Sequence, residues 1–568
     1  MKLAIDLGTT HCLCAIWKND EVVCVPNIFG EYKTPSIIHV DDNEEVVVGK
    51  IAKERRVSEP RNTVELFKRT MGKTKKYKVN KREYNSMELS ALMIRQMIDD
   101  AEKYTECKVT EVVVSVPAYF TDAQRIETRN SALLCGVKAE RIINEPSAAA
   151  LAYYLSNKEE GLYLVFDFGG GTLDVTVVDI FDGMIDILSI AGNTSLGGID
   201  IDRVIYNAFL EKNPSLSSMD DKNKAILMNK AEKAKIDLDT LDETVMGIIY
   251  EDNKYEMQIN RQTLIDLCSS INFEIYNVIE RALRNCGSTI NDIVQVVSIG
   301  GSSKGYVILK YLERLVGKPI NISINPDEAI VRGIGAVVGI MDREESIKEI
   351  ILTDVCPFTL GVGIINDQFS PIIERNTTLP ASKTSGYTTT RDNQDVIKFD
   401  MYQGESMIAS ENSLIDSIEV KVPSKKKGEA FVDITFSYDI NGILHVLATS
   451  ELENEDISKV IYTNKHLSEK DIAVGNERIA SIKEQKSDYT KYQQWLIDKA
   501  NSLYLQIDDE KRTLMLEEMK LFINKLSNNP SRVQQKRVEN DFKNTLENIE
   551  KDLEDVFKLE KVDTSLFS

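Results

Sequence analysis

The sequence lacks the long apolar run and the paired cysteines that mark membrane-spanning and exported proteins. No window holds the roughly 18 uncharged apolar residues that a membrane helix needs, so we expect no membrane partner. Asp6 interrupts the first apolar stretch too early for a secretory signal peptide. The eight cysteines are scattered and form no Cys-x-x-Cys pair, which is typical of reduced thiols in the cytosol. We therefore predict a cytoplasmic protein.

The chain also lacks the excess of positive charge that nucleic-acid binding requires. Its 69 Lys and Arg residues are outnumbered by 90 Asp and Glu residues, which gives a formal net charge of −21. A face that binds a phosphate backbone must be basic, and only one local basic run, Lys68–Arg82, stands against this background. We therefore expect no nucleic-acid partner. The 568 residues are too many for one core and predict about two to four domains.

The first 347 residues have the pattern of an α/β domain. Short apolar runs alternate there with longer segments of helical periodicity. The expected elements include strands at Lys2–Ile5, Val112–Val116, Leu162–Phe166 and Ile293–Ile299, and helices at Glu88–Glu102 and Ile271–Asn285.

Two further regions follow. Residues 355–465 alternate apolar and polar side chains, as at Ile397, Phe399 and Met401, and Asn441-Gly442 separates two runs as a hairpin turn does. This predicts a half-buried β-sandwich. Residues 466–568 repeat apolar residues at helical spacing and predict a helical lid. The short apolar segment 348–354 between the first two regions is either the first strand of the sandwich or a linker that docks on the α/β domain.

One supersecondary unit occurs twice in the α/β region. Each copy is an apolar strand, an Asp, a glycine-rich turn with Thr, and a second strand; the copies begin at Lys2 and Tyr163 and carry Asp6 and Asp167. Glycines let backbone N–H groups approach phosphate oxygens, and Thr hydroxyls add donors. An Asp beside phosphates needs a cation between them, so each copy implies Mg²⁺. The repeat predicts two turns that grip phosphates from both sides.

These segments resemble the actin-like ATPase fold and, more specifically, the heat-shock chaperones of the DnaK class, over almost the whole chain. The segment TDVCPFTLGV at Thr353 looks most like the HscC branch. The resemblance implies an actin-like two-lobed ATPase domain, a β-sandwich peptide-binding domain and a C-terminal helical lid. The motifs that carry it are IDLGTT at Ile5, VPAYF at Val116, INEPSAAALAY at Ile143, FDFGGGTLDV at Phe166, LGGIDID at Leu196, AEKAK at Ala231, NPDEA at Asn325, RNTTLP at Arg375, YQGE at Tyr402 and NGILHV at Asn441.

The resemblance implies an ATP/ADP site and assigns roles to the residues that match. The catalytic residues would be Asp6, Lys68, Glu145, Asp167 and Thr172, with Lys68 positioning the attacking water. The metal site would comprise Asp6, Glu145 and Asp167 for hydrated Mg²⁺, with Asp174 beside them for K⁺. The nucleotide contacts would be Gly8, Thr9, Thr10, Gly169, Gly170, Gly171, Gly197, Gly198, Glu232, Lys235, Gly300, Gly301, Ser302, Lys304 and Asp327.

The family's client cleft and signal relay also have matching residues. The cleft would bind extended apolar segments of unfolded client proteins, and ATP would open it by docking the linker. The cleft residues would be Val362, Ile365, Thr390, Gln394, Ile397 and Phe399. The relay residues would be Pro117, Arg125, Ile351, Leu352 and Asp354.

Some residues depart from the family pattern or are ambiguous without it. Lys304 replaces the usual Arg, and an ammonium cannot stack on adenine as a guanidinium does, so we expect weaker nucleotide binding. Thr353 replaces a leucine in the linker, which predicts weaker docking. His11 replaces the usual Asn or Tyr, and would be either a surface histidine or a pH-sensitive part of the ATP site. Without the resemblance, Lys68 would be a solvated cation of the basic run.

Partners and alternatives complete the prediction. The resemblance implies a J-domain co-chaperone, whereas the segment between Asp202 and Leu264 looks abbreviated, so the usual nucleotide-exchange factor would not fit. The chain end lacks an EEVD tail, which favours a bacterial origin. Two alternatives share the same fold: a metabolite kinase and a filament-forming protein.

Overall fold

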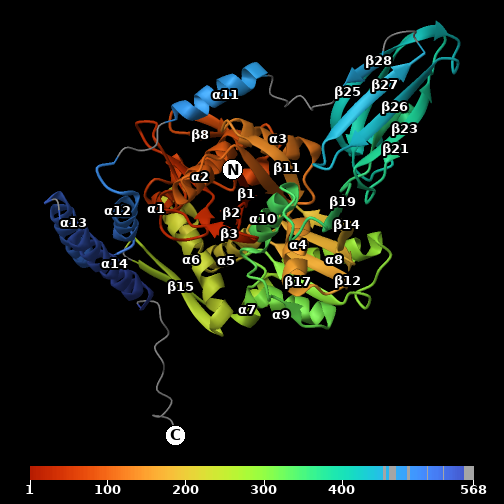
Figure 1. Ribbon diagram of the computed structural model, residues 1–568. Helices are drawn as coiled ribbons and strands as arrows, with labels where there is room; N and C mark the ends of the chain where they lie inside the picture. The colour runs from red at the N-terminus through yellow and green to blue at the C-terminus, as the bar shows by residue number, and fades with distance from the viewer. Residues whose placement is uncertain are drawn as a thin grey trace.

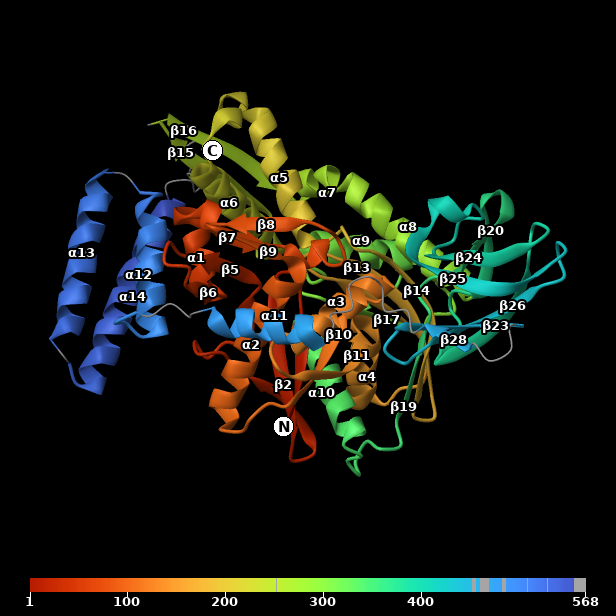
Figure 2. The same ribbon diagram turned by 90° about the horizontal axis from the view of Figure 1, so that it is seen from above.

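The computed structural model describes residues 1–251, 253–451, 456–459, 469–482, 487–507, 509–528 and 530–555. Figure 1 shows an α/β domain in the middle of the molecule, with a β-sandwich on one side and the helices α12 to α14 on the other. The view from above agrees, with the sandwich and these helices at opposite ends of the α/β domain (Figure 2). The two smaller parts therefore pack against the same domain from different sides.

The first lobe of the α/β domain is built on a mixed sheet in the order β11-β10-β1-β2-β3, with β4 paired to β2. Strands β1, β10 and β11 are parallel, whereas β1, β2 and β3 are antiparallel neighbours. The strands are β1 (Lys2–Leu7), β2 (His11–Lys18), β3 (Glu21–Val25), β4 (Thr34–Pro35), β10 (Glu111–Val116) and β11 (Lys138–Asn144).

The second lobe repeats this plan. Its sheet runs β18-β17-β12-β13-β14-β19-β22, with β12, β17 and β18 parallel and β12, β13 and β14 antiparallel. The strands are β12 (Gly161–Phe168), β13 (Leu173–Phe181), β14 (Met184–Asn193), β17 (Gln295–Ile299), β18 (Ile320–Asn321), β19 (Ile351–Val355) and β22 (Thr378–Leu379). Both Asp-Gly turns thus join the first antiparallel pair of their own sheet, as the sequence repeat predicts.

Helices pack between and outside the two sheets. Helices α4 (Glu145–Asn157) and α10 (Ala329–Met341) cross where Gly333 meets Ala148, and a Cβ on Gly333 would lie 1.7 Å from the Ala148 carbonyl oxygen. This close crossing joins the lobes at their base. The outer helices are α2 (Ser86–Thr105) and α3 (Asp122–Leu133) on the first lobe, and α8 (Ser269–Asn285) and α9 (Tyr306–Val316) on the second.

Each lobe carries an insertion that raises a wall of the cleft between them. The first insertion contains β5 (Ile37–Val40), β6 (Val46–Val48), α1 (Lys50–Ser58), β7 (Thr63–Glu65), β8 (Lys76–Val79) and β9 (Arg82–Asn85). The second contains α5 (Gly198–Lys212), α6 (Asp221–Thr240), β15 (Glu243–Tyr250), β16 (Asn253–Asn260) and α7 (Arg261–Leu267). Helices α1 and α6 pack against each other and so face one another across the cleft.

The elements predicted for the α/β region are present. The run Ile293–Ile299 is the least accurate, since β17 begins only at Gln295. Ile293 is nevertheless buried in the second lobe, whereas Val294 is exposed. The apolar run in the sequence is therefore longer than the strand, because a buried loop residue before the strand is also apolar.

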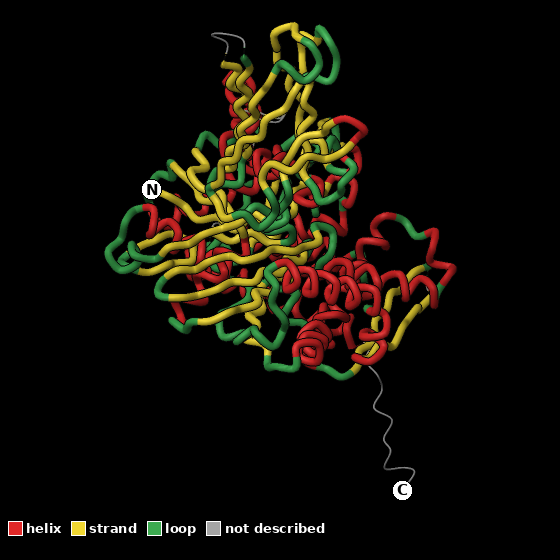
Figure 3. Tube along the Cα trace, turned by 90° about the vertical axis from the view of Figure 1, so that its right-hand side faces the viewer, coloured by secondary structure: helices red, strands yellow, loops and turns green. Residues whose placement is uncertain are grey.

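The β-sandwich consists of two antiparallel sheets around one apolar core, and its strands project from the rest of the molecule (Figure 3). The Asn441-Gly442 turn joins β26 to β27 as predicted, with Gly442 at φ +68°. One sheet has β20 (Leu360–Ile364), β21 (Gln368–Ile373), β24 (Gln394–Gln403) and β25 (Ser413–Lys425), and the other has β23 (Ala381–Thr388), β26 (Phe431–Tyr438), β27 (Leu444–Ser450) and β28 (Asp456–Lys459).

The segment between the two regions is a strand of the α/β domain. Strand β19 pairs in parallel with β14, with Ile351 opposite Met184 and Leu352 opposite Ile185. Its last residues pair with β22, the short strand that precedes β23 of the sandwich in the chain. The segment therefore pairs with strands on both sides, and its role as an interdomain linker stays a prediction.

The C-terminal helices lie on the α/β domain and not over the sandwich. They are α11 (Glu469–Ser481), α12 (Lys491–Tyr504), α13 (Asp509–Ser527) and α14 (Arg532–Asp555), and the boundary predicted at residues 465–466 lies outside the described residues. Helix α11 packs on the first lobe, where Ile479 and Ile482 join the apolar core of that lobe. We call α12 to α14 the bundle. No helix within the described ranges is long and apolar enough to cross a membrane.

Candidate functional site

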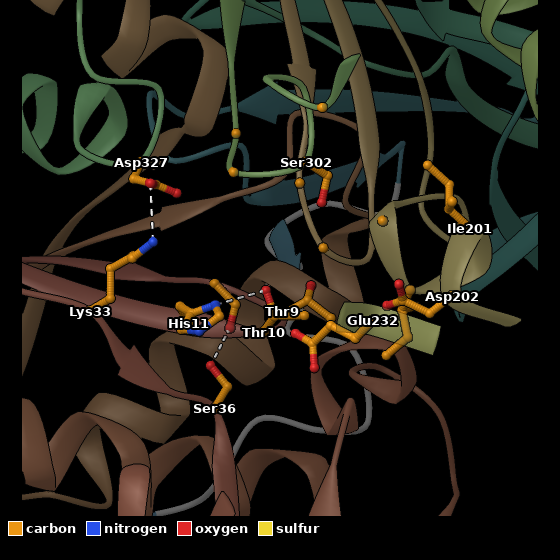
Figure 4. Close-up of a pocket in the computed structure, with 18 of the residues that line it drawn as sticks. Thr9, Thr10, His11, Lys33, Ser36, Ile201, Asp202, Glu232, Ser302 and Asp327 are labelled. Carbon is orange, nitrogen blue, oxygen red and sulfur yellow. Dashed lines mark hydrogen bonds and ion pairs between the residues drawn. The ribbon is translucent and has the colours of Figure 1, made fainter. Parts of the chain in front are cut away.

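A cavity of about 370 Å³ opens between the lobes, at the turns that follow β1 and β12. Both lobes contribute to its lining, and Figure 4 shows side chains from the two sides facing each other. The predicted residues that line it are Asp6, Gly8, Thr9, Thr10, Lys68, Glu145, Asp167, Gly169, Gly170, Thr172, Gly198, Glu232, Lys235, Gly300, Gly301, Ser302, Lys304 and Asp327.

The two glycine turns touch across the cleft. A Cβ on Gly170 would lie 2.2 Å from Thr10 Cγ2, and a Cβ on Gly171 would lie 2.4 Å from Thr9 Cγ2. Gly171 does not line the cavity, because it packs behind this contact. Any larger residue would push the turns apart, so the glycines are required by the closeness of the lobes.

Gly197 and Asp174 also lie behind the cavity wall. A Cβ on Gly197 would lie 2.5 Å from Gly171 N, so Gly197 supports the second turn from behind. Asp174 is 1% exposed, and its Oδ1 accepts a hydrogen bond from Tyr119 N at 3.2 Å. Their predicted direct contacts with nucleotide or metal are therefore not supported by the cavity lining.

The carboxylates at the base of the cavity are buried close together. Burial, and next the charge of Glu145, raise the pKa of Asp6 to about 7 and the pKa of Asp174 to about 8. The same causes raise the pKa of Asp167 well above its usual range. Asp167 Oδ2 and Asp174 Oδ2 have no hydrogen-bond partner. Such clustering of negative charge requires a cation to balance it.

Hydrated Mg²⁺ fits this cluster. Among the residues that the structure describes, no three His, Cys, Asp or Glu side chains are arranged to ligate one metal ion directly. Mg²⁺ keeps several waters when bound, so carboxylates such as Asp6 and Asp167 can hold it through those waters. The unpartnered Asp167 oxygen is available for that purpose.

Lys68 lies close to these carboxylates and is not solvated. It lies on the short helix Phe67–Thr70, is 3% exposed, and its Nζ donates to Glu145 Oε1 at 2.8 Å. Glu145 is itself buried at the start of α4. The reading of Lys68 as a surface cation is therefore wrong, and the role implied by the resemblance agrees with its position.

Ion pairs connect the residues at the opposite end of the cavity, which is expected to hold the adenosine. Lys235 Nζ lies 2.7 Å from Asp202 Oδ1 and donates to Gly198 O at 3.2 Å. Lys304 Nζ donates to Asp327 Oδ2 at 2.8 Å. Lys304 is thus held by a carboxylate, which agrees with the expectation that it does not act as a stacking cation.

Two residues that were not among the predicted site residues, Lys33 and His11, also line the cavity. Lys33, from the first lobe, donates to Asp327 Oδ2 at 3.1 Å and so bridges the lobes (Figure 4). Burial acts to raise the pKa of Asp327, but hydrogen bonds from Lys304 and Lys33 outweigh it and lower that pKa. Lys33 stands in no site motif. Asp202 is the last residue of the motif LGGIDID and lies one helical turn after Gly198.

His11 lines the cavity and is not a surface residue. Its Nδ1 lies 3.3 Å from Thr10 Oγ1. Burial, and next the charges of Lys53 and Lys33, lower the pKa of His11 to about 4. The imidazole is therefore neutral near pH 7 and presents an uncharged ring to the cavity.

The predicted cleft residues are not gathered at one open surface. Val362, Ile397 and Phe399 are buried in the sandwich core, whereas Ile365 is 60% exposed. Thr390 N donates to the side chain of its predicted partner Gln394 at 2.9 Å. The client-binding role of these residues stays a prediction.

Two of the predicted relay residues, Arg125 and Asp354, in contrast, belong to one hydrogen-bond network. Arg125 Nη1 donates to Asn441 O of the sandwich at 3.4 Å, and Arg125 Nη2 donates to Asn144 Oδ1 at 2.6 Å. Asn144 Nδ2 in turn donates to both carboxylate oxygens of Asp354 at 2.8 Å. Pro117 is buried, and Ile351 and Leu352 lie in β19, the strand that also contains Asp354.

Comparisons with known proteins agree with this architecture. The "Hsp70 protein" family matches residues 2–565. The chain belongs to the Hsp70 family. It is 35% identical over 486 residues to the chaperone protein DnaK of Thermotoga neapolitana, covering 83% of this chain and 82% of that protein. It is 34% identical over 525 residues to the chaperone protein DnaK of Ureaplasma urealyticum, covering 90% and 86%.

Hsp70 proteins are ATP-dependent molecular chaperones, and the predicted chaperone function and ATPase activity are thereby confirmed. Another relative, the chaperone protein DnaK of Thermosipho africanus, is 35% identical over 523 residues, 89% of this chain and 87% of its own. The metabolite-kinase and filament alternatives are not favoured. The finer placement in the HscC branch stays a prediction.

Proposed function

We propose that this Hsp70 protein hydrolyses ATP between its two lobes and uses the reaction to control the capture and release of unfolded client segments by the sandwich. The observation that carries the proposal is the buried Lys68–Glu145 pair, which stands between the two glycine turns and beside Asp6 and Asp167. A binding-only pocket does not need a buried lysine fixed at its reacting end.

Each residue has a part in the proposed reaction. The backbone N–H groups of the glycine turns and the hydroxyls of Thr9, Thr10 and Thr172 donate to the phosphates. Lys68 orients the attacking water and offsets the charge that develops on the transferred phosphoryl group. Glu145 fixes the Lys68 ammonium in place. Bound Mg²⁺ supplies further positive charge to the phosphate oxygens.

The linker and the relay network would couple this reaction to the sandwich. The pairing of β19 with β14, and the contacts of Arg125 and Asp354, support a docked state that corresponds to the ATP-bound form. Hydrolysis would release β19 and let the helical lid close on a client. If ATP weakens client binding, clients must weaken the docked state by the same factor.

Several finer points belong to the same proposal. Asp174 would help to bind K⁺. A J-domain protein would stimulate hydrolysis, a nucleotide-exchange factor of the usual kind would not fit, and the protein would act in the cytoplasm of a bacterium. Its relatives named above are bacterial DnaK proteins.

The decisive experiment measures ATP turnover with and without an extended apolar peptide. Lys68→Ala is expected to lower turnover by about 100-fold or more, as the loss of a group that stabilises a transition state does. Replacing Ile351 and Leu352 by Asp is expected to abolish the peptide response and leave basal turnover measurable. Turnover that is unaffected by peptide in the unmodified chain rules out the coupling.

A further inference from the structure

A second cavity lies between the first lobe and the start of α12, apart from the nucleotide cleft. Its volume is about 120 Å³, and no described residue lines both this cavity and the nucleotide cavity. The first lobe supplies most of the lining, from residues 27–29, β6, α1 and α2. The remaining side comes from Ser487, Tyr489, Lys491 and Gln494, close to where α12 lies beside α1 (Figures 1 and 2). The cavity is therefore a separate candidate site.

One part of the lining is apolar. Val46, Ile51 and Leu92 are each at most 5% exposed, and Ile28 is half-buried. Small-molecule sites combine such apolar surface with a few polar groups that fix the orientation of the ligand. These side chains therefore suit a short alkyl chain.

Asp100 on α2 adds a buried carboxylate to the same cavity. It is 5% exposed, and its Oδ1 accepts a hydrogen bond from Gln96 Nε2 at 3.0 Å, one helical turn earlier. Among the residues that the structure describes, none forms an ion pair with Asp100. Burial raises the pKa of Asp100 to about 6, because the hydrogen bond from Gln96 and the charge of Lys491 offset burial only in part. A carboxylate that is buried and ionised near pH 7 is costly without a paired cation, so it favours a ligand that supplies one.

The cationic side chains of the lining are engaged elsewhere or are exposed. Lys50 Nζ donates to Glu31 Oε1 at 2.6 Å. Arg95 Nη1 donates to the carbonyl oxygen of Ile479 at 2.6 Å. Lys491, at the start of α12, is exposed. None of these three cations is therefore held against the Asp100 carboxylate.

We propose that this cavity binds a small primary alkylammonium ion. The ammonium group donates to the Asp100 carboxylate, and the alkyl chain covers Val46, Ile51 and Leu92. A cavity of about 150 Å³ holds benzene, so a volume of about 120 Å³ suits a chain of about four carbons. An ammonium is also more compact than a planar guanidinium and fits this volume better. The proposal does not rest on the proposed function, because the lining has no residue in common with the nucleotide cavity or the predicted client cleft.

The test is a titration of the full-length chain with n-butylammonium, followed by saturation-transfer NMR of the ligand. 1-Butanol is the matched ligand control, because it has the same chain and nearly the same size but no charge. ADP and Mg²⁺ are present throughout, so that the nucleotide cleft is occupied. At about pH 7.5 the ammonium is expected to bind about 10-fold or more tightly than the alcohol, as a hydrogen bond to a buried charge allows.

Asp100→Asn tests the carboxylate. Asparagine keeps an oxygen that can accept from Gln96, so the fold should persist, whereas the advantage of the ammonium over the alcohol should fall to about 2-fold or less. Asp99→Asn is the matched control. Asp99 lines the same cavity but is exposed, so solvent screens its charge and the advantage should change by less than about 2-fold.

Ile28→Phe tests the cavity itself. Because Ile28 is half-buried, the larger ring can be accommodated at modest cost while it fills part of the cavity. Both ligands should then bind about 5-fold or more weakly, although Asp100 is unchanged.

Four results would overturn the proposal. Absence of detectable binding by either ligand means that the cavity holds only water. Equal binding of the ammonium and the alcohol means that no buried charge is engaged. Equal losses in Asp99→Asn and Asp100→Asn mean that the ammonium only samples an acidic surface. Unchanged binding in Ile28→Phe places the ligand elsewhere on the chain.

Discussion

The α/β domain presents two docking faces of opposite character. The sandwich docks through hydrogen bonds that involve backbone groups: Ile142 N donates to Asn441 Oδ1 at 3.1 Å, and Leu444 N donates to Asp122 Oδ1 at 3.1 Å. The bundle docks through a buried ion pair between Arg55 and Asp498 and through the aromatic side chain of Trp495.

The difference shows what each face is suited to do. Hydrogen bonds in which a backbone group takes part are exchanged for bonds to water with a small net change in free energy, so the sandwich can dock and undock at moderate cost. A buried charge that loses its partner has no such substitute unless the whole face opens to water. The sandwich face is therefore expected to separate from the α/β domain at a lower cost in free energy than the bundle face.

The largest expected effect comes from Trp495→Ala, which breaks the bundle face. Loss of a buried tryptophan costs about 3–5 kcal/mol, so the bundle is expected to leave α1. Hydrogen–deuterium exchange of α1 should then rise sharply. Trp495→Phe, which keeps an aromatic ring but loses the bond to Glu54, should show a much smaller rise. Equal exchange in both variants would mean that the ring does not hold the bundle.

The next effect comes from Asp354→Ala, which breaks the sandwich face. Asn144 Nδ2 and Ser147 Oγ then lose a common acceptor, and docking should weaken by about 2–3 kcal/mol. Small-angle scattering should show a larger radius of gyration in the presence of ATP. Asp354→Asn retains one acceptor oxygen and should expand less. An unchanged radius in Asp354→Ala would show that this network is not needed for docking.

A change of pH should affect the sandwich face in a predictable direction. Burial raises the pKa of Asp122 to about 7 while it is docked, and undocking would return it towards 3.8. Docking therefore takes up a proton, is favoured at low pH and weakens as the pH rises through about 7. Between about pH 6 and about pH 8 the change should be about 1 kcal/mol.

This pH effect can be measured by hydrogen exchange of the Leu444 amide, whose N–H group donates a hydrogen bond to Asp122. Asp122→Asn should remove most of the dependence. Burial also raises the pKa of Asp354, so a residual trend of the same sign should persist. Stronger docking at the higher pH would contradict the assignment.

The smallest effect concerns the ion pair that bridges the lobes at the surface. Lys33 and Lys304 both bind Asp327 and are about half exposed, so each is worth at most about 1 kcal/mol. Lys33→Ala should speed nucleotide release by about 5-fold at low salt, because it removes the contact between lobes. Lys304→Ala removes only a contact within one lobe and should change release less.

Salt distinguishes this surface contact from the buried bundle pair. At about 0.5 M salt the effect of Lys33→Ala should vanish. Asp498→Leu, in contrast, is expected to raise hydrogen–deuterium exchange of α1 at low and at high salt alike, because burial of the Arg55–Asp498 pair excludes the screening ions. Loss of both effects at high salt would show that the two faces do not differ in the way described.

Much of the site could be predicted from the sequence, because its parts are local. The Asp6 and Asp167 turns were recognisable since glycine, Thr and Asp at fixed spacing satisfy steric and charge requirements within a few residues. The Asn441-Gly442 turn was predictable for the same reason. Lys68 was predictable only through the family resemblance, because nothing near it in the chain shows that Glu145, 77 residues away, accepts its hydrogen bond.

Contacts between distant residues were not predictable in this way. Arg55 and Asp498 are 443 residues apart, and each stands in a segment that reads as an ordinary amphipathic helix. Lys33 meets Asp327 across 294 residues, and no motif contains Lys33. Helical spacing indicates which side chains of the lid are buried but not which surface buries them, so the placement of the lid could not be derived.

The sequence by itself determined the two phosphate-gripping turns, the order of the α/β, β and helical regions, and the membership of the Hsp70 family. These follow from backbone sterics, hydrogen bonding and apolar periodicity, which act over a few residues. Only the tertiary structure decided that Lys68 is buried, that Asp327 binds a lysine from each lobe, and that the bundle lies on α1. Each of these depends on charged and aromatic side chains brought together from remote segments. Burial makes such a pairing selective, whereas in water the same pairing would contribute little to stability.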